Sequence, residues 1–216
     1  MTRKSYPVCY ICESAPGTTK DHIIPQNLFP KGLRNNLWTA PACRPCNDSL
    51  APDEELFRIF ITGQANRESV GLEVWRGGVR KTLAKQPKLK AMLAGQMRMV
   101  EVRTPAGIIL GKRWAMFAKQ DRIEPVIMKI VRGLYYREHG KLLGPTDSQV
   151  FLHPTEYLPA MLKRAKRGQL NPPVFEYAFV VAEDDPRATI WWLIFYQQTL
   201  FVVSCMPPGR QIAQAG

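Results

Sequence analysis

Two cysteine pairs of identical CxxC spacing constrain the fold of the first quarter of the chain more than any other feature. The sequence CYIC contains Cys9 and Cys12, the sequence CRPC contains Cys43 and Cys46, and 30 residues separate the two pairs. Four thiolates in this pattern suit one tetrahedral Zn²⁺ ion, and a site filled by protein ligands is structural because no position remains for a substrate. We therefore expect these four cysteines to hold a structural zinc ion.

Other uses of paired cysteines fit this sequence less well. Neither pair has the strand-then-helix context of a thioredoxin-like redox motif. The residue type permits an iron–sulfur cluster, but the spacing favours zinc. The fifth cysteine, Cys205, makes the number odd, which argues against a disulfide scaffold. Cys205 lies in an apolar stretch, so we expect it to be a core residue.

Residues 1–50 are rich in Pro, Asn and Cys and lack long periodic stretches, and a fold this short and irregular needs stabilisation such as a bound metal ion. We expect short strands at Tyr6–Tyr10, Asp21–Ile24 and Asn36–Ala40. The acidic run Asp53-Glu54-Glu55 is typical of a helix N-terminus, and the apolar residues after it predict a buried helix face. Gly63 then marks a break, so we expect one unit over residues 1–62 and a second over 63–216.

Residues 63–216 predict helices and an antiparallel sheet. Helices are expected over Asn66–Lys85, Ile123–His139 and Thr155–Arg167. The central helix should bury its apolar residues and direct three cations outward: Lys129, Arg132 and Arg137. Strands are expected at Met97–Thr104, from Ile108 onward, and at Phe175–Ala182, Thr189–Tyr196 and Leu200–Cys205. The last three predict an antiparallel meander with helices on one side, which is an α+β fold.

The adjacent residues Trp191 and Trp192 must point to opposite faces of their predicted strand. At most one of them should therefore enter the same core. The other is a candidate interface or base-stacking residue.

Positive charge is concentrated in one part of the chain. The net charge is +12, and residues 63–140 hold 16 Lys and Arg against 6 Asp and Glu, whereas the segments on either side are nearly balanced. A basic segment of this kind favours a polyanionic partner, because each phosphate that is neutralised releases counterions. The alternative is a generally basic surface. The N-terminus has no apolar signal core and no window is apolar enough for a membrane helix, so we expect a cytoplasmic location without membrane association.

Between the cysteine pairs lies the dipeptide Asp21-His22, in the string DHIIP, followed by NLWTAPAC and CRPCN. A lone histidine is more often structural than catalytic, but this ordered combination resembles the HNH endonucleases with a zinc-binding ββα-metal motif. The resemblance covers about residues 6–62. It implies a small zinc-stapled ββα-metal module, to which the helices and antiparallel sheet of residues 63–216 are added.

The resemblance also implies roles for individual residues. His22 would be the general base that takes a proton from the attacking water, and Asp21 would be a ligand of a catalytic Mg²⁺ or Mn²⁺. Asn36 would hold the loop that orients the His22 ring. Asn35 is an adjacent alternative, but Leu37 follows Asn36 as in the family pattern. Asn47 takes a position where the family more often has His, and its carbonyl oxygen favours a hard cation.

The same residues suit phosphodiester hydrolysis on chemical grounds, because this reaction needs a base for water and a cation that neutralises charge. We therefore expect a DNA endonuclease acting on double-stranded DNA, with a possible homodimer. Restriction, host defence, a mobile element and a phage are alternative settings for it. A non-catalytic zinc-stabilised nucleic-acid-binding protein is the first alternative. A zinc-stabilised interaction protein without a nucleic-acid role is the second. Lys31 and Arg34 could contact phosphate, whereas His139 and His153 are expected to be structural or exposed.

Overall fold

The computed structural model describes residues 7–64, 68–104, 106–117, 119–152 and 159–209, and the structural statements below refer to these ranges. In chain order, the helices are α1 (Arg44–Ser49), α2 (Ala51–Gly63), α3 (Val70–Val74), α4 (Arg80–Lys85), α5 (Pro87–Gly95), α6 (Gln120–His139) and α7 (Pro159–Leu162). The strands are β1 (Thr19–His22), β2 (Thr39–Ala42), β3 (Met97–Arg103), β4 (Ile109–Met116), β5 (Asp147–Leu152), β6 (Lys166–Leu170), β7 (Phe175–Val181), β8 (Thr189–Phe195) and β9 (Thr199–Met206). Among the helices of these ranges, none has both the length and the apolar character needed to cross a bilayer.

A hairpin followed by a helix forms the N-terminal layer. Strand β1 pairs antiparallel with β2, so that Thr19 lies opposite Ala42 and His22 opposite Thr39. Helix α1 begins directly after β2, with Cys43 as its N-cap and a proline in its first turn, where the missing N–H costs nothing. The expectation that neither cysteine pair opens a helix after a strand is therefore wrong for the second pair. The second strand begins at Thr39 rather than at Asn36, because Asn36 has a left-handed φ of 58° that belongs to a turn.

The strand predicted at Tyr6–Tyr10 is not formed in its described part, where Val8 makes an isolated bridge to Pro16 and Tyr10 lies in a turn. Tyr6 lies outside the described residues. The short chain segment before β1 is instead held by separate backbone hydrogen bonds, such as Tyr10 N–H to the carbonyl of Pro41.

The C-terminal part forms one five-stranded antiparallel sheet with the strand order β5-β9-β8-β7-β6. The meander predicted from the sequence is present as β7-β8-β9. The two other strands, β5 and β6, were not predicted. Both tryptophans of β8 are buried, Trp191 in the main core and Trp192 in a second cluster with Ala178, Ile190 and Val202. Trp192 is therefore a packing residue of the opposite face and is not exposed for stacking.

The helix predicted at Thr155–Arg167 is wrong at its C-terminal end. Residues 153–158 lie outside the described residues, helix α7 ends at Leu162, and Lys166 and Arg167 lie in β6. These two residues pair with Phe179 and Ala178 of β7. The cations that suggested a helix terminus lie on an edge strand, where Lys and Arg discourage further strand pairing.

The helix expected over Asn66–Lys85 is interrupted. Its described part begins at Val70, where the Ser69 side chain accepts a hydrogen bond from Gly71 N–H, and Asn66 lies outside the described residues. Gly77 and Gly78 lie in a π-helical turn, Trp75–Val79, that joins α3 to α4. Pro87 ends this run as predicted, since it begins α5.

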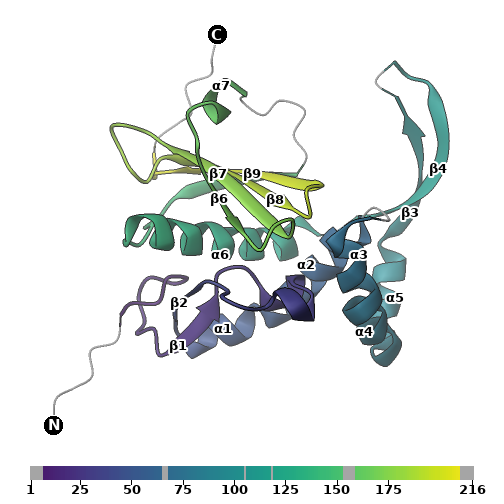
Figure 1. Cartoon of the computed structure of the whole chain (residues 1–216), viewed down its shortest axis with the longest axis horizontal. Coiled ribbons are helices and arrows are strands. Elements are labelled where there is room, and N and C mark those ends of the chain that lie inside the picture. The colour runs from purple at the N-terminus through teal and green to yellow at the C-terminus, as the bar shows by residue number, and fades with distance from the viewer. Residues whose placement is uncertain (1–6, 65–67, 105, 118, 153–158, 210–216) are drawn as a thin grey trace.

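Helix α6 lies between the sheet and the layer formed by β1, β2, α1 and α2 (Figure 1). Its apolar residues belong to a hydrophobic core that includes Ile23 and Phe57 from the N-terminal layer and Trp191 from the sheet. At Gly133 the contact is so close that a Cβ atom would lie 2.6 Å from Cγ2 of Ile23. The first 62 residues thus share one continuous core with the rest of the chain.

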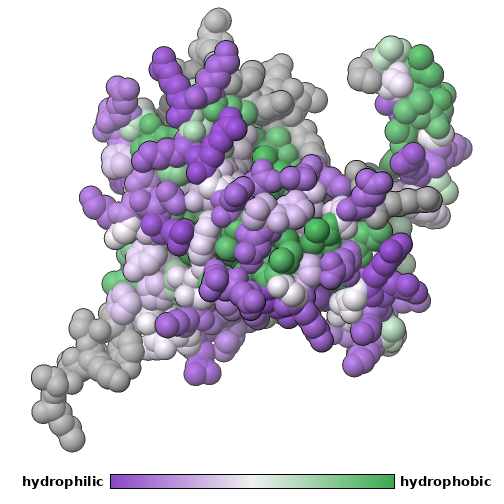
Figure 2. All heavy atoms as spheres, viewed as in Figure 1, coloured by the Kyte–Doolittle hydropathy of each residue, from purple (hydrophilic) through white to green (hydrophobic). Residues whose placement is uncertain are grey.

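The hairpin β3–β4 projects from this body as an arm (Figure 1). The arm was predicted as two strands with a turn at residues 105–107. It exposes large apolar side chains, which gather at its end in Figure 2, together with cations of the basic segment. The exposed apolar residues of the arm are Met97, Met99, Ile108, Ile109, Leu110 and Trp114.

Candidate functional site

The four paired cysteines form one cluster. Cys9 and Cys12 lie in the turn before β1, whereas Cys43 and Cys46 lie at the start of α1, and the hairpin brings these two segments together. The four sulfur atoms all lie within 4.8 Å of one another. Tetrahedral zinc with bonds of about 2.3 Å requires sulfur atoms about 3.8 Å apart, and the Sγ atoms of Cys12 and Cys43 are 3.9 Å apart. The cluster predicted from the spacing is confirmed, and it can hold a metal ion such as zinc.

Within the cluster, the pKa values of Cys12 and Cys46 are shifted in opposite directions. Hydrogen bonds from the Ser14 side chain and from the backbone of Ala15 and Ser14 lower the pKa of Cys12 to about 6. Cys9 and Cys43 are buried, and Cys12 is exposed. Metals bind the thiolate form, so the lowered pKa of Cys12 favours binding at neutral pH, whereas burial raises the pKa of Cys46 and opposes it. The four ligands would leave no open coordination position, so this centre is structural in character.

His22 is the last residue of β1 and is half-buried. Burial lowers the pKa of its imidazole, Lys129 lowers it further, and Asp21 opposes them. The ring is therefore neutral near pH 7, the state that a general base needs. Its Nδ1 atom is buried and has no hydrogen-bond partner among the described residues.

Asp21 precedes His22 and points to the opposite face of β1. It is 6% exposed, and both of its carboxylate oxygens have donors. The hydroxyl of Tyr10 donates to Oδ2, and Nζ of Lys129 lies 2.9 Å from Oδ1 and 2.8 Å from Oδ2. The same ammonium group also binds a carboxylate oxygen of Glu54 in α2. Burial raises the pKa of Glu54, and the positive charge of Lys129 opposes this shift.

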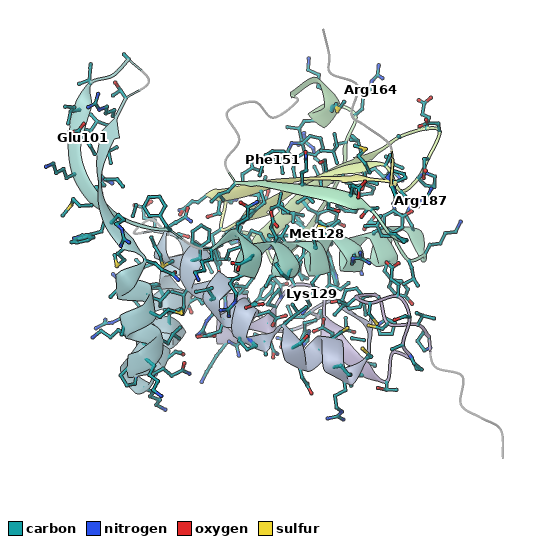
Figure 3. The ribbon with its side chains drawn as sticks, turned by 180° about the vertical axis from the view of Figure 1, so that it is seen from behind. Glu101, Met128, Lys129, Phe151, Arg164 and Arg187 are labelled. Atoms are coloured by element: carbon teal, nitrogen blue, oxygen red, sulfur yellow. The ribbon has the colours of Figure 1, made fainter. Side chains whose placement is uncertain are left out.

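The prediction that Lys129 points outward is wrong, because its exposed fraction is 2%. Figure 3 shows Lys129 between α6 and the N-terminal layer. Arg132 pairs with Glu13 at 2.8 Å, and the guanidinium of Arg137 lies 3.9 Å above the ring of Trp38. The polar face of α6 therefore faces the hairpin–helix layer, since the sheet already covers its other side.

The predicted asparagines lie in different surroundings. Nδ2 of Asn47 donates a 3.2 Å hydrogen bond to Oγ1 of Thr19, which shares a strand face with Asp21. Asn36 is exposed in its left-handed turn conformation.

The two loop cations that were candidates for phosphate contact differ in their surroundings. Arg34 donates from Nε to the carbonyl of Phe29, and Lys31 is exposed.

Asn171, between β6 and β7, holds the loop that carries the central asparagines. Its Nδ2 donates to the carbonyl of Leu33 at 2.6 Å and to that of Asn35 at 3.3 Å. Sequence reasoning missed Asn171, because 136 residues separate it from Asn35 and no local pattern marks it. Tyr196, in the turn after β8, donates from its hydroxyl to the carbonyl of Leu28, which lies earlier in the connection between β1 and β2.

The second predicted ion, a Mg²⁺ or Mn²⁺ bound by Asp21 and Asn47, does not fit the described arrangement. Both oxygens of Asp21 accept hydrogen bonds from protein donors, and one of those donors is already a cation. A divalent ion at Asp21 would have to displace the ammonium of Lys129.

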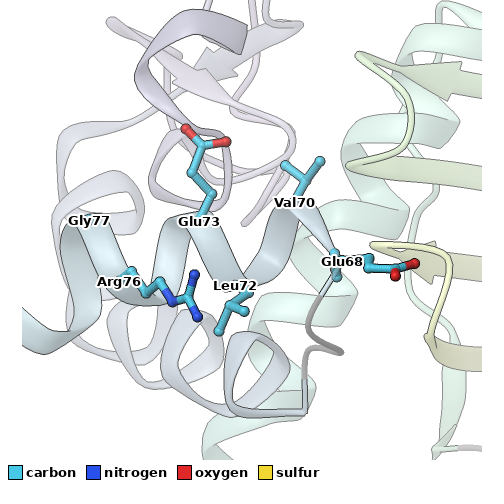
Figure 4. Close-up of a pocket in the computed structure, with 7 residues that line it drawn as sticks. Glu68, Val70, Leu72, Glu73, Arg76 and Gly77 are labelled. Atoms are coloured by element: carbon cyan, nitrogen blue, oxygen red, sulfur yellow. The ribbon is translucent and has the colours of Figure 1, made fainter.

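A hollow along α3 is lined by residues other than those of the candidate site (Figure 4). Its lining includes Glu68, Glu73 and Arg76, and none of the predicted site residues contributes to it. The remaining predicted residues are structural, as expected: His139 packs against Tyr135 and Phe179, and Cys205 is buried in β9. His153 lies outside the described residues.

Comparison of the chain with protein-family models, with curated proteins and with solved structures gives no match.

Proposed function

We propose that this chain is a metal-dependent endonuclease of the HNH type that hydrolyses phosphodiester bonds in DNA. The supporting observation is the position of His22 at the end of β1, within a hairpin–helix unit whose four cysteines can hold a structural zinc ion. Its lowered pKa keeps the imidazole neutral at pH 7. A neutral, half-exposed imidazole can take a proton from water as the water attacks phosphorus.

The proposal assigns the remaining roles as the resemblance implies. Asn36, or its neighbour Asn35, would orient the loop, and Asp21 and Asn47 would bind a catalytic Mg²⁺ or Mn²⁺ after Lys129 is displaced from Asp21. Such a cation would neutralise phosphate charge. The ammonium group of Lys129 contacts both carboxylate oxygens of Asp21, so a requirement for a divalent cation is tested by comparing cleavage in Mg²⁺, Mn²⁺ and EDTA.

Double-stranded DNA is the proposed substrate because of the concentrated positive charge of residues 63–140. The arm adds exposed cations at a distance from the body, among them Lys112 and Arg113. A single hydrolytic site per chain would cut both strands most simply as a homodimer. The proposed biological setting is restriction or defence.

Plasmid cleavage tests the proposal. Supercoiled DNA, with and without methylated bases, is incubated with the zinc-loaded chain in Mg²⁺, Mn²⁺ or EDTA. We expect cutting in a divalent cation and a loss of about a hundredfold or more in His22→Ala. His139→Ala is the matched control, since His139 is also half-buried with a lowered pKa but packs away from the hairpin. Equal cutting by wild type and His22→Ala would refute the assignment.

The second candidate is a non-catalytic, zinc-stabilised nucleic-acid-binding protein. The enclosed ion pair between Asp21 and Lys129 favours it, because this carboxylate is not open to a cation. In this case wild type and His22→Ala would bind DNA with the same salt dependence, and neither would cut in any cation.

A further inference from the structure

Lys129 reaches from α6 into the enclosed space between β1 and α2. Its side chain is 2% exposed, and the two carboxylates that it binds, Asp21 and Glu54, are 7% and 18% exposed. A lysine is almost never so deeply buried without a partner, because removing its charge from water costs several kcal/mol. Two acidic side chains from separate elements offset this cost.

The oxygens around the ammonium group are of the kind that hard divalent cations prefer. Two carboxylates, from β1 and from α2, meet at Nζ of Lys129, and the Tyr10 hydroxyl donates to Oδ2 of Asp21. Carboxylate oxygens are ligands for Mg²⁺ and Mn²⁺. An ammonium group and a divalent ion cannot occupy this position together, since both need the same carboxylate oxygens and repel each other.

We propose that the ammonium group of Lys129 fills a cation-binding position between the carboxylates of Asp21 and Glu54, and that it excludes a divalent ion from this position. The inference deepens the proposed function, because Asp21 is the carboxylate that the HNH resemblance makes a cation ligand. A cation that acts through Asp21 must first displace Lys129. Lys129 thereby sets the affinity of the position for divalent ions.

Manganese binding tests this inference independently of DNA cleavage. The full chain is loaded with zinc to fill the cysteine cluster, and Mn²⁺ is titrated with electron paramagnetic resonance detection. We expect Lys129→Met, which keeps the length but removes the charge, to bind one Mn²⁺ at least about tenfold more tightly than wild type. The double variant Lys129→Met/Asp21→Asn should lose this gain, and Lys88→Met on the exposed side of α5 should behave as wild type.

Equal Mn²⁺ affinity in wild type and Lys129→Met would overturn the inference, as would a gain that survives in the double variant. If Lys129→Met does not fold, the wild type provides the test. Its backbone amides of Asp21 and Ile23 should keep their NMR line widths at micromolar Mn²⁺. Selective broadening of these two resonances would show a cation bound with Lys129 in place. Absence of DNA cleavage would refute the nuclease proposal and leave this result unchanged.

Discussion

The protonation state of His22 governs the expected pH dependence. Its pKa lies below the ordinary imidazole value of about 6.5. Since the neutral ring is the active form, the acid limb of the cleavage profile should have its midpoint below that value. The unfolded chain binds the proton more readily, so the stability contributed by neutral His22 is lost as the pH falls below about 6.5. NMR titration of the imidazole checks both statements, and a midpoint at or above 6.5 would contradict them.

The buried ion pair predicts a non-additive effect on stability. Lys129→Met should lower the free energy of unfolding by about 3–5 kcal/mol, because it leaves two buried carboxylates without their cation. Asp21→Asn should cost less, because Lys129 still pairs with Glu54. The double variant should lose less than the sum of the two, since both substitutions remove the same ion pair. Urea denaturation measures the three values. Additive losses would show that the two side chains do not depend on each other.

The close approach of α6 to the segment after β1 predicts that Gly133 does not tolerate a larger side chain. Gly133→Ala places a Cβ atom 2.6 Å from Ile23 and should cost about 1–3 kcal/mol through overpacking. Gly95→Ala is the control, because no atom lies within 4 Å of the added carbon. Its effect should be near zero or stabilising. The two variants are compared by urea denaturation, and equal losses would argue against the contact.

The cysteine cluster predicts that metal binding stabilises the N-terminal layer. Cys43→Ser should reduce bound zinc from one ion per chain to nearly none and lower the melting temperature. Cys205→Ser should retain the zinc, since Cys205 lies in β9 outside the cluster. Elemental analysis and thermal melts measure both effects. Full zinc content in Cys43→Ser would exclude this cysteine as a ligand.

Across the whole molecule, the arm is predicted to contribute to the electrostatic attraction between the protein and DNA. Lys112→Ala/Arg113→Ala should reduce the slope of log affinity against log salt by about 2, which corresponds to two phosphate contacts. Arg187→Ala is the control, because Arg187 lies beyond the basic segment and pairs with Asp185 at 2.9 Å. Fluorescence anisotropy with a DNA duplex gives the slopes. An unchanged slope in the arm variant would place the contacts elsewhere.

Local sequence patterns predicted the cysteine cluster and several of the helices and strands. The spacing of Cys9, Cys12, Cys43 and Cys46 predicted their cluster, and the apolar periodicity of residues 123–139 predicted α6. The alternation in residues 97–104 predicted the first strand of the arm. These features depend on neighbours in the chain or on ligand chemistry, so they are visible without a fold.

The residues alone predicted the cysteine cluster and a short strand that carries Asp21-His22, and the family resemblance implied the hairpin and helix around them. The inward position of Lys129, the contact of Asn171 with the loop and the strand conformation of Lys166 depend on the folded chain. Helical periodicity shows which side of α6 is polar but not what covers that side. Here the sheet and the N-terminal layer cover opposite sides of α6. Lys129, which the sequence pattern places at the surface, is therefore the partner of the buried carboxylate of Asp21.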